Sequence, residues 1–198
     1  KTMTTGEGGM VVFKDKKLYD KAAAWHDHGH ENNPEFPRWE DSRSSSGFNY
    51  RMNEMQGAVG LAQLKKLDFV VNEQRKNAKL IMDAISDLPV EMRFAPKGSY
   101  ETADALVFLV ENNNIARKCR DALLEAGLGT KILPEAITWH FAGTWDHMPE
   151  LVNRNGKDLT NAFPISLELL NRSVSLPISV NMIEKFPQKI KNALASAL

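Results

Sequence analysis

An alternating run of histidines, His26, His28 and His30, is the densest group of potentially reactive side chains in the sequence, and Asp27 lies within it. Neutral imidazole is a good ligand for zinc, copper or nickel. Metal sites in short tracts, however, usually bring cysteines or further carboxylates at defined spacings. We therefore predict no metal site here, and a solvated loop is the plain interpretation of the run.

Asn49 and Arg51 lie two residues apart in the segment GFNYRMNEMQ, residues 47–56. An amide or a guanidinium that donates to a phosphate or carboxylate oxygen forms a charge-assisted hydrogen bond, which is stronger than a neutral one. From the residues alone, the start of this segment could equally be a turn before a helix, and an arginine beside a helix start is commonly structural. Anion binding and a structural role therefore both stay open for this pair.

The chain begins with KTMTTGEGG, residues 1–9. On its own, Lys1 is an ordinary terminal lysine, and the glycines match neither of the common phosphate-binding patterns, GxGxxG and GxxxxGK[ST]. The segment 47–56 follows, then GLAQL at residues 60–64 and LD at residues 67–68. In this order, the strings resemble the DegT/DnrJ/EryC1/StrS family, the sugar aminotransferases that use pyridoxal 5'-phosphate (PLP), and the resemblance extends to about Asn181.

In that family the lysine that opens the first string carries PLP as a Schiff base, and the resemblance implies this role for Lys1. Its amine must be neutral to add to the cofactor aldehyde, so its pKa must be lowered by desolvation and nearby positive charge. The freed amine then moves a proton between substrate and cofactor, and PLP is the electron sink. The resemblance also implies that Asn49 reaches across a homodimer and donates a hydrogen bond to the PLP phosphate of the partner subunit.

The resemblance further suggests residues that line the substrate pocket. His28 belongs to an Asp-His-Gly segment that resembles one near the family's active site, and Arg51 is a candidate partner for a phosphate or carboxylate. Trp139 and His140, in the aromatic run TWHF that WDH follows at residues 145–147, fall where the family has pocket-shaping residues. Their spacing resembles the branch that forms 8-amino-3,8-dideoxy-octulosonate (Kdo8N), although core packing is an equal alternative for such dense aromatics.

The resemblance implies an α/β fold, the C-terminal part of a fold-type-I PLP transferase. Residues 1–50 would be the end of the large PLP-binding domain, and residues 51–198 a long connecting helix and a small α+β domain. That family fold places the other cofactor ligands before the lysine. We therefore expect this chain to be part of a longer polypeptide, and alone it would expose the seam where the rest of the sheet belongs.

Residue patterns independently predict a mixed fold. They predict strands at 10–13, 105–110, 130–133 and 174–177, and helices at 16–25, 115–126, 164–170 and 183–198. Residues 26–48 are predicted to be a long loop, and long ordered loops are usually functional. A further helix begins after the N-cap Asn53, with Gln56 at the capping-box position. It extends to Leu88, either unbroken or as two helices bent near Asp68.

Composition limits the partners. The 198 residues contain 25 lysines and arginines and 25 aspartates and glutamates, so the formal net charge is zero. Bulk charge therefore gives no attraction to nucleic acid or to an anionic membrane, and no apolar run approaches the roughly 20 residues that span a bilayer. There is no signal-peptide pattern at the start. The single cysteine, Cys119, favours a reducing compartment, and we expect the cytoplasm.

The sequence therefore predicts a PLP-dependent aminotransferase that moves an amino group, from a donor such as glutamate, to a keto-sugar in cell-surface or lipopolysaccharide sugar biosynthesis. A PLP-dependent sugar dehydratase is an alternative, but in those family members a histidine replaces the lysine that Lys1 matches. A non-catalytic or regulatory protein that keeps the fold is a second alternative. Covalent attachment of PLP to Lys1 would separate these hypotheses.

Overall fold

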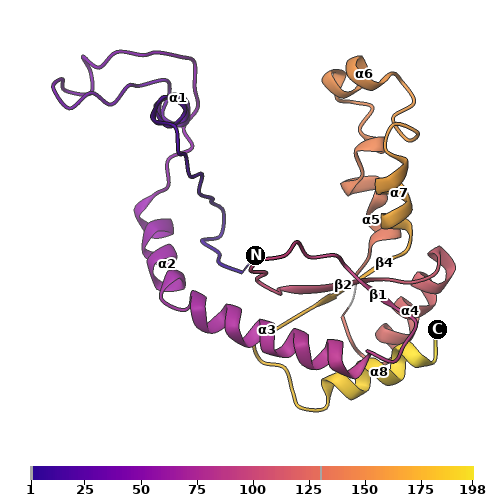
Figure 1. Ribbon diagram of the computed structural model, residues 1–198. Coiled ribbons are helices and arrows are strands. Elements are labelled where there is room, and N and C mark those ends of the chain that lie inside the picture. Colours follow the sequence, from indigo (N-terminus) through magenta and orange to yellow (C-terminus); the bar gives the residue numbers. More distant parts are fainter. Residues whose placement is uncertain (1, 130) are drawn as a thin grey trace. The chain divides into compact units, whose positions relative to one another are not determined.

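The computed structural model describes residues 2–129 and 131–198, which fall into two compact units, residues 3–67 and residues 68–198. Both helices and strands are present (Figure 1), as the predicted mixed fold requires. None of the helices in the described parts of the chain combines the length and apolar character that a membrane-spanning segment needs. The predicted extent of a large domain over residues 1–50 stays a prediction.

The second unit is built on a four-stranded antiparallel sheet in the order β1-β2-β4-β3. Its strands are β1 (Glu91–Met92), β2 (Ala105–Leu109), β3 (Lys131–Ile132) and β4 (Ser173–Pro177). The central pair is in register over the whole length of both strands, with Val107 opposite Ser175. The three predictions for this sheet, at 105–110, 130–133 and 174–177, are confirmed where the structure describes them; Thr130 lies outside the described residues.

Three helices complete the hydrophobic core of this unit: α3 (Leu67–Ala84), α4 (Asn113–Glu125) and α8 (Phe186–Ala195). Phe108 of β2, Leu123 of α4 and Leu194 of α8 have no exposed surface. Helix α4 begins after the N-cap Asn112, whose side chain accepts from the N–H of Ile115 at 3.1 Å. It ends before Gly127, whose φ of +68° is left-handed, as a C-terminal glycine predicts.

A second layer of helices was predicted only in part. Helix α7 (Pro164–Asn171) is confirmed, whereas α5 (Leu133–His140), the 3-10 turn η1 (Ala142–Thr144) and α6 (Pro149–Asn155) were not predicted. Helices α5 and α7 lie side by side (Figure 1). The last helix, α8, begins at Phe186 rather than at the predicted residue 183.

The first unit contains two helices, α1 (Lys16–His26) and α2 (Glu54–Leu64), joined by a long loop. The predicted capping box is present: the N–H of Gln56 donates to Asn53 Oδ1 at 2.8 Å, and the N–H of Asn53 donates to Gln56 Oε1 at 3.0 Å. Because α2 ends at Leu64 and α3 begins at Leu67, the two-helix alternative is correct and the single long helix is wrong.

The prediction of a buried strand at residues 10–13 is wrong. This segment is in neither a helix nor a strand, and Met10, Val11 and Val12 are 84%, 74% and 85% exposed. A buried strand needs neighbouring strands to satisfy its backbone groups, and no named strand occurs in the described residues of the first unit. Apolar, β-branched composition alone was therefore a misleading signal.

Candidate functional site

The loop between α1 and α2 folds back so that residues 25–28 lie beside residues 48–50. The N–H of His28 donates to the Phe48 carbonyl at 3.0 Å, and the N–H of Phe48 donates to the Trp25 carbonyl at 2.9 Å. The N–H of Tyr50 donates to the His26 carbonyl at 2.9 Å. This antiparallel pairing places Asp27 opposite Asn49, and therefore joins two candidate segments that are distant in sequence.

Two glycines permit this close approach. Gly29 has a φ of +85°, and a Cβ atom there would lie 1.8 Å from the carbonyl oxygen of Ser45. At Gly47 a Cβ atom would lie 2.4 Å from the carbonyl oxygen of Trp25. Only glycine leaves room for the backbone at these positions.

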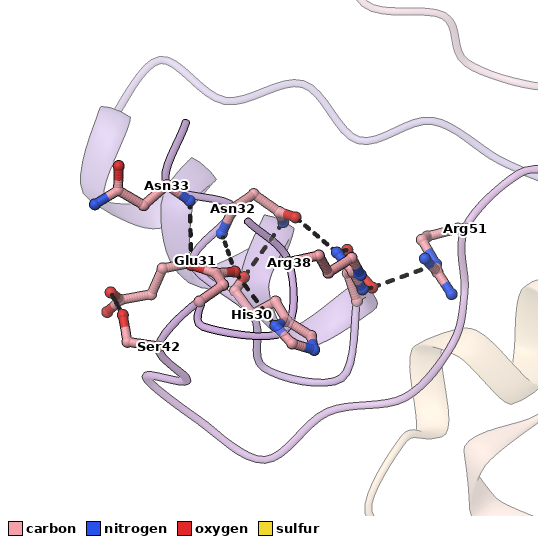
Figure 2. A network of polar contacts seen from close by, with 9 residues as sticks. His30, Glu31, Asn32, Asn33, Arg38, Ser42 and Arg51 are labelled. Atoms are coloured by element: carbon pink, nitrogen blue, oxygen red, sulfur yellow. Dashed lines mark hydrogen bonds and ion pairs between the residues drawn. The ribbon is translucent and has the colours of Figure 1, made fainter. Parts of the chain in front are cut away.

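Asp27 is the centre of the charge network. It is only 4% exposed. Arg38, which Figure 2 labels, donates to both of its carboxylate oxygens, from Nη1 to Oδ2 at 2.8 Å and from Nη2 to Oδ1 at 2.5 Å. Arg51 approaches the same carboxylate with Nε at 3.3 Å from Oδ1. The hydrogen bond from Arg38 and the charges of both arginines outweigh the effect of burial, and they lower the pKa of Asp27 from 3.8 to about 2.

Arg51 also orients the side chain of Asn49. Its Nε donates to Asn49 Oδ1 at 2.9 Å. A guanidinium has no acceptor, so the atom that faces it must be the amide oxygen, and the amide nitrogen remains as the outward donor. Within residues 2–129 and 131–198, neither this nitrogen nor the two Nη groups of Arg51 has a hydrogen bond, and the Arg51 side chain is 44% exposed.

A second carboxylate, Asp41, binds the part of the same loop that contains His30, Asn32 and Asn33. It accepts hydrogen bonds from the backbone N–H groups of Asn32 at 2.9 Å and Asn33 at 3.2 Å, and it lies 3.2 Å from His30 Nδ1. Burial acts to raise the pKa of Asp41, but these donors together hold it below its usual value. Asp41 makes no ion pair with Arg51 among the described residues.

The three histidines of the alternating run have three different environments. His30 is buried beside Asp41, and the ring of His26 contacts the Ala23 carbonyl through Nδ1 at 2.5 Å. His28 is exposed and has a left-handed φ of +56°. In the parts of the chain that the structure describes, no three His, Cys, Asp or Glu side chains gather as metal ligands would.

A hollow of about 1080 Å³ within the first unit is lined in part by Trp25, His26 and Tyr50 of the paired segments. The residues that line the hollow are mainly apolar and aromatic, and a few, such as His26 and Lys21, are polar. The rings of Trp25 and Tyr50 are 5.4 Å apart at their centroids, and Phe48 packs edge-on against Trp25 at 5.3 Å. An apolar hollow with a few polar groups at its border is the usual setting of a small-molecule site.

The predicted residues of the second unit divide into core and surface. Phe141 is 2% exposed and packs edge-on against Phe163, so it belongs to the core. Trp139 is 73% exposed at the end of α5, where its carbonyl accepts a hydrogen bond from Trp145 Nε1 at 3.3 Å. His140 is also exposed and lies beside the Trp139 ring. Core packing therefore does not explain Trp139.

The structure thus brings Asn49 and Arg51 together and presents His28 nearby on the paired segment. Lys1 lies outside the described residues, so its predicted role stays a prediction. Sequence reasoning missed Asp27 and Arg38 as parts of the site. The only sequence signal for this pair was the position of Asp27 inside the histidine run. Its partner Arg38 lies 11 residues away, in a loop whose sequence has no periodicity.

Comparison with known proteins identifies the family. Residues 1–195 match the model of the DegT/DnrJ/EryC1/StrS aminotransferase family. The chain is 23% identical to the GDP-perosamine synthase of Vibrio cholerae over 209 residues, which covers 98% of this chain and 49% of that protein. It is 32% identical to the GDP-perosamine synthase of Escherichia coli O157:H7 over 131 residues, or 66% of this chain and 34% of that protein.

Solved structures give the same fold. The sugar aminotransferase CalS13 from Micromonospora echinospora superposes with a TM-score of 0.77 at 20% identity, over 100% of this chain and 50% of that one. Helicobacter pylori PseC, an aminotransferase involved in the biosynthesis of pseudoaminic acid, gives a TM-score of 0.73 at 21% identity with the same coverage. The chain spans about half the length of these structures and half or less of the curated relatives above.

Proposed function

Because the chain belongs to the DegT/DnrJ/EryC1/StrS aminotransferase family, we propose that the protein is a PLP-dependent aminotransferase that transfers an amino group to a keto-sugar in surface-polysaccharide biosynthesis. The observation that carries this proposal is the donor pair of Asn49 and Arg51, held beside a buried carboxylate. Glutamate is the proposed amino donor.

The residues present fit the phosphate of PLP. Asp27, Arg38 and Arg51 together carry one negative and two positive charges, so the cluster keeps a net positive charge beside the outward amide of Asn49. Phosphate oxygens only accept hydrogen bonds near neutral pH, and amide and guanidinium groups are strong donors to them. Asn49 and Arg51 would therefore hold the phosphate, in a homodimer that joins each donor pair to the cofactor of the partner subunit.

The remaining predicted residues complete the proposed mechanism. PLP, when bound, supplies the electron sink of the reaction. The Lys1 amine would hold the cofactor and would carry the proton as general base and acid. His28 of the first unit is a proposed sugar-binding residue, and so, independently, are Trp139 and His140 of the second unit; all three are exposed.

The acceptor is proposed to be a nucleotide-linked keto-sugar. The relatives support this class by their names, which include GDP-perosamine synthase and, in Helicobacter pylori, UDP-4-amino-4,6-dideoxy-N-acetyl-beta-L-altrosamine transaminase. The free ulosonic acid of the Kdo8N branch is the second candidate, supported by the exposed Trp139 beside His140. Activity with each acceptor class, in the full-length protein, distinguishes them.

A dehydratase is the competing activity, since the chain is 31% identical over 139 residues to the GDP-4-keto-6-deoxy-D-mannose 3-dehydratase of Yersinia pseudotuberculosis. Lysine rather than histidine at position 1 favours the transaminase.

Cytoplasmic location is proposed as well. It is supported by the single cysteine, Cys119, which has no second cysteine in this chain with which to form a disulfide.

Borohydride reduction of the full-length protein with PLP tests the proposal. We expect a visible absorption band before reduction and a pyridoxyl label on the peptide that contains Lys1 afterwards, with no label in the Lys1→Arg variant. A protein that shows neither band nor label would contradict the transaminase and leave the non-catalytic alternative.

A further inference from the structure

We propose that Asp27 is a positioning residue for the cofactor phosphate, because it holds Arg51 and through it keeps the amide nitrogen of Asn49 turned outward. The identity of the bound group rests on the proposed function. The positioning itself follows from contacts within the first unit alone.

The first step is the orientation of Asn49. An exposed asparagine amide can turn over at little cost, since its oxygen and nitrogen ends are nearly the same size. The 2.9 Å contact with Arg51 Nε selects the orientation in which the oxygen faces inward. Without Arg51 in this place, the amide oxygen would face a phosphate about as readily as the nitrogen, and a phosphate repels that oxygen.

The second step is the position of Arg51. Arginine has a long, flexible side chain that loses considerable rotamer freedom when fixed. The Asp27 carboxylate lies 3.3 Å from its Nε, so the inner edge of the guanidinium is held between Asp27 and Asn49. The two outer Nη groups, which have no hydrogen bond among the described residues, are then left for an anion.

The third step is the rigidity of Asp27. Its backbone N–H donates to the Ala24 carbonyl at 3.0 Å at the end of α1, and Asp27 pairs with Asn49 across the turned loop. The forked contact with Arg38 fixes both carboxylate oxygens. Arg38 also donates to Asn32 Oδ1 at 3.0 Å, which connects the carboxylate to the rest of the loop (Figure 2).

Asp41 provides a matched control. It is a carboxylate of the same loop with an almost fully buried side chain and a lowered pKa, and it binds Asn32, Asn33 and His30. It has no contact with Arg51 or Asn49 among the interactions of the described residues. A loss of loop structure in general should therefore appear in both aspartate variants, whereas a loss of positioning should appear only at Asp27.

The test compares the affinities for PLP and for pyridoxal, which lacks the phosphate, in full-length protein carrying Asp27→Asn or Asp41→Asn. Equilibrium titration followed by absorbance gives both dissociation constants. Asp27→Asn removes a negative charge, which by itself would favour an anion. Because the variant also loses the contact that holds Arg51, we expect it to weaken PLP binding about tenfold, the size of one lost charge-assisted hydrogen bond, and to leave pyridoxal binding unchanged. Asp41→Asn should keep the wild-type ratio of the two affinities.

If the ratio of PLP affinity to pyridoxal affinity is unchanged in Asp27→Asn, including the case in which both affinities fall equally, the positioning role is overturned. An unaltered protein that binds PLP no better than pyridoxal would instead refute the proposed phosphate site itself. Asp27→Glu covers the case in which the asparagine variant does not fold, because it keeps the charge and displaces the carboxylate by one methylene. We expect Asp27→Glu to lower the ratio of PLP affinity to pyridoxal affinity by a smaller factor than Asp27→Asn. An unchanged ratio in Asp27→Glu would count against the proposal.

Discussion

The two units of the chain are stabilised by different interactions. In residues 68–198 the interior is mainly apolar: Phe108, Leu123 and Val174 have no exposed surface, and the buried polar side chains there, Gln74, Asn77 and Ser173, are uncharged. In residues 3–67 the titratable side chains of Asp27 and His30 are buried, and Ala24 has the only buried apolar side chain among the described residues of that unit. Hydrophobic burial is non-directional, whereas hydrogen bonds and ion pairs depend on geometry. Stability and site geometry should therefore respond to different substitutions.

The largest effect is expected in the core of the second unit. Phe108→Ala should lower the free energy of unfolding by about 3–5 kcal/mol, because it removes a fully buried ring and leaves a cavity. Urea denaturation followed by circular dichroism measures the loss. Trp39→Ala is the control from the first unit, since Trp39 is 84% exposed, and it should change stability by less than about 0.5 kcal/mol. Equal losses would contradict the apolar core around Phe108 as a main source of stability.

Gly29→Ala should disrupt the paired loop. The left-handed φ alone costs about 1–2 kcal/mol for a non-glycine residue, and the Cβ atom would also collide with Ser45 O, so we expect a loss of more than about 2 kcal/mol. Hydrogen exchange at the His28 and Phe48 amides reports it directly. Gly6→Ala is the matched control for backbone strain, because Gly6 has a φ of +86° but no atom within 4 Å of the position that a Cβ atom would take. Protection that survives Gly29→Ala would show that the close approach is not required.

Acid should release the charge network. The pKa of Asp27 is lowered from 3.8 to about 2 in the folded protein. The contribution of the ionised Asp27 side chain to stability is therefore fully present above about pH 4, where an aspartate of the unfolded chain is ionised. It is lost as the pH falls through about 2. An NMR titration of the Asp27 carboxyl carbon should give a midpoint near 2, and Arg38→Gln should move it upward. A midpoint at the ordinary aspartate value would contradict the network.

The smallest effect is expected at the start of α2. Asn53→Ala removes the side chain that accepts from the Gln56 N–H at 2.8 Å, and loss of such a cap costs about 1 kcal/mol. Exchange of the amides in the first turn of α2 is the measurement. These amides should lose protection while those at Phe48 and Tyr50 keep theirs, since the loop pairing does not use Asn53.

Features with a local cause were predictable from the sequence. The capping box of Asn53 and Gln56 and the glycine after α4 depend on residues within one helical turn. Features that need distant partners were not predictable: residues 10–13 have strand-like composition but no strand to pair with among the described residues. Helices α5 and α6 were missed for another reason, because their sequences lack a clear apolar period. The site shows the same division, since Asn49 came from a motif, whereas Asp27 and Arg38 meet only after the loop has folded.

The most direct measurement is the affinity of full-length protein for PLP and for pyridoxal after Asn49→Ala, with Asn53→Ala as the neighbouring asparagine control. If the outward amide of Asn49 binds the cofactor phosphate, Asn49→Ala will weaken PLP binding about tenfold without changing the affinity for pyridoxal, and Asn53→Ala will change neither. If both ligands keep their affinities in Asn49→Ala, or lose them equally, the donor pair of Asn49 and Arg51 is not a phosphate site.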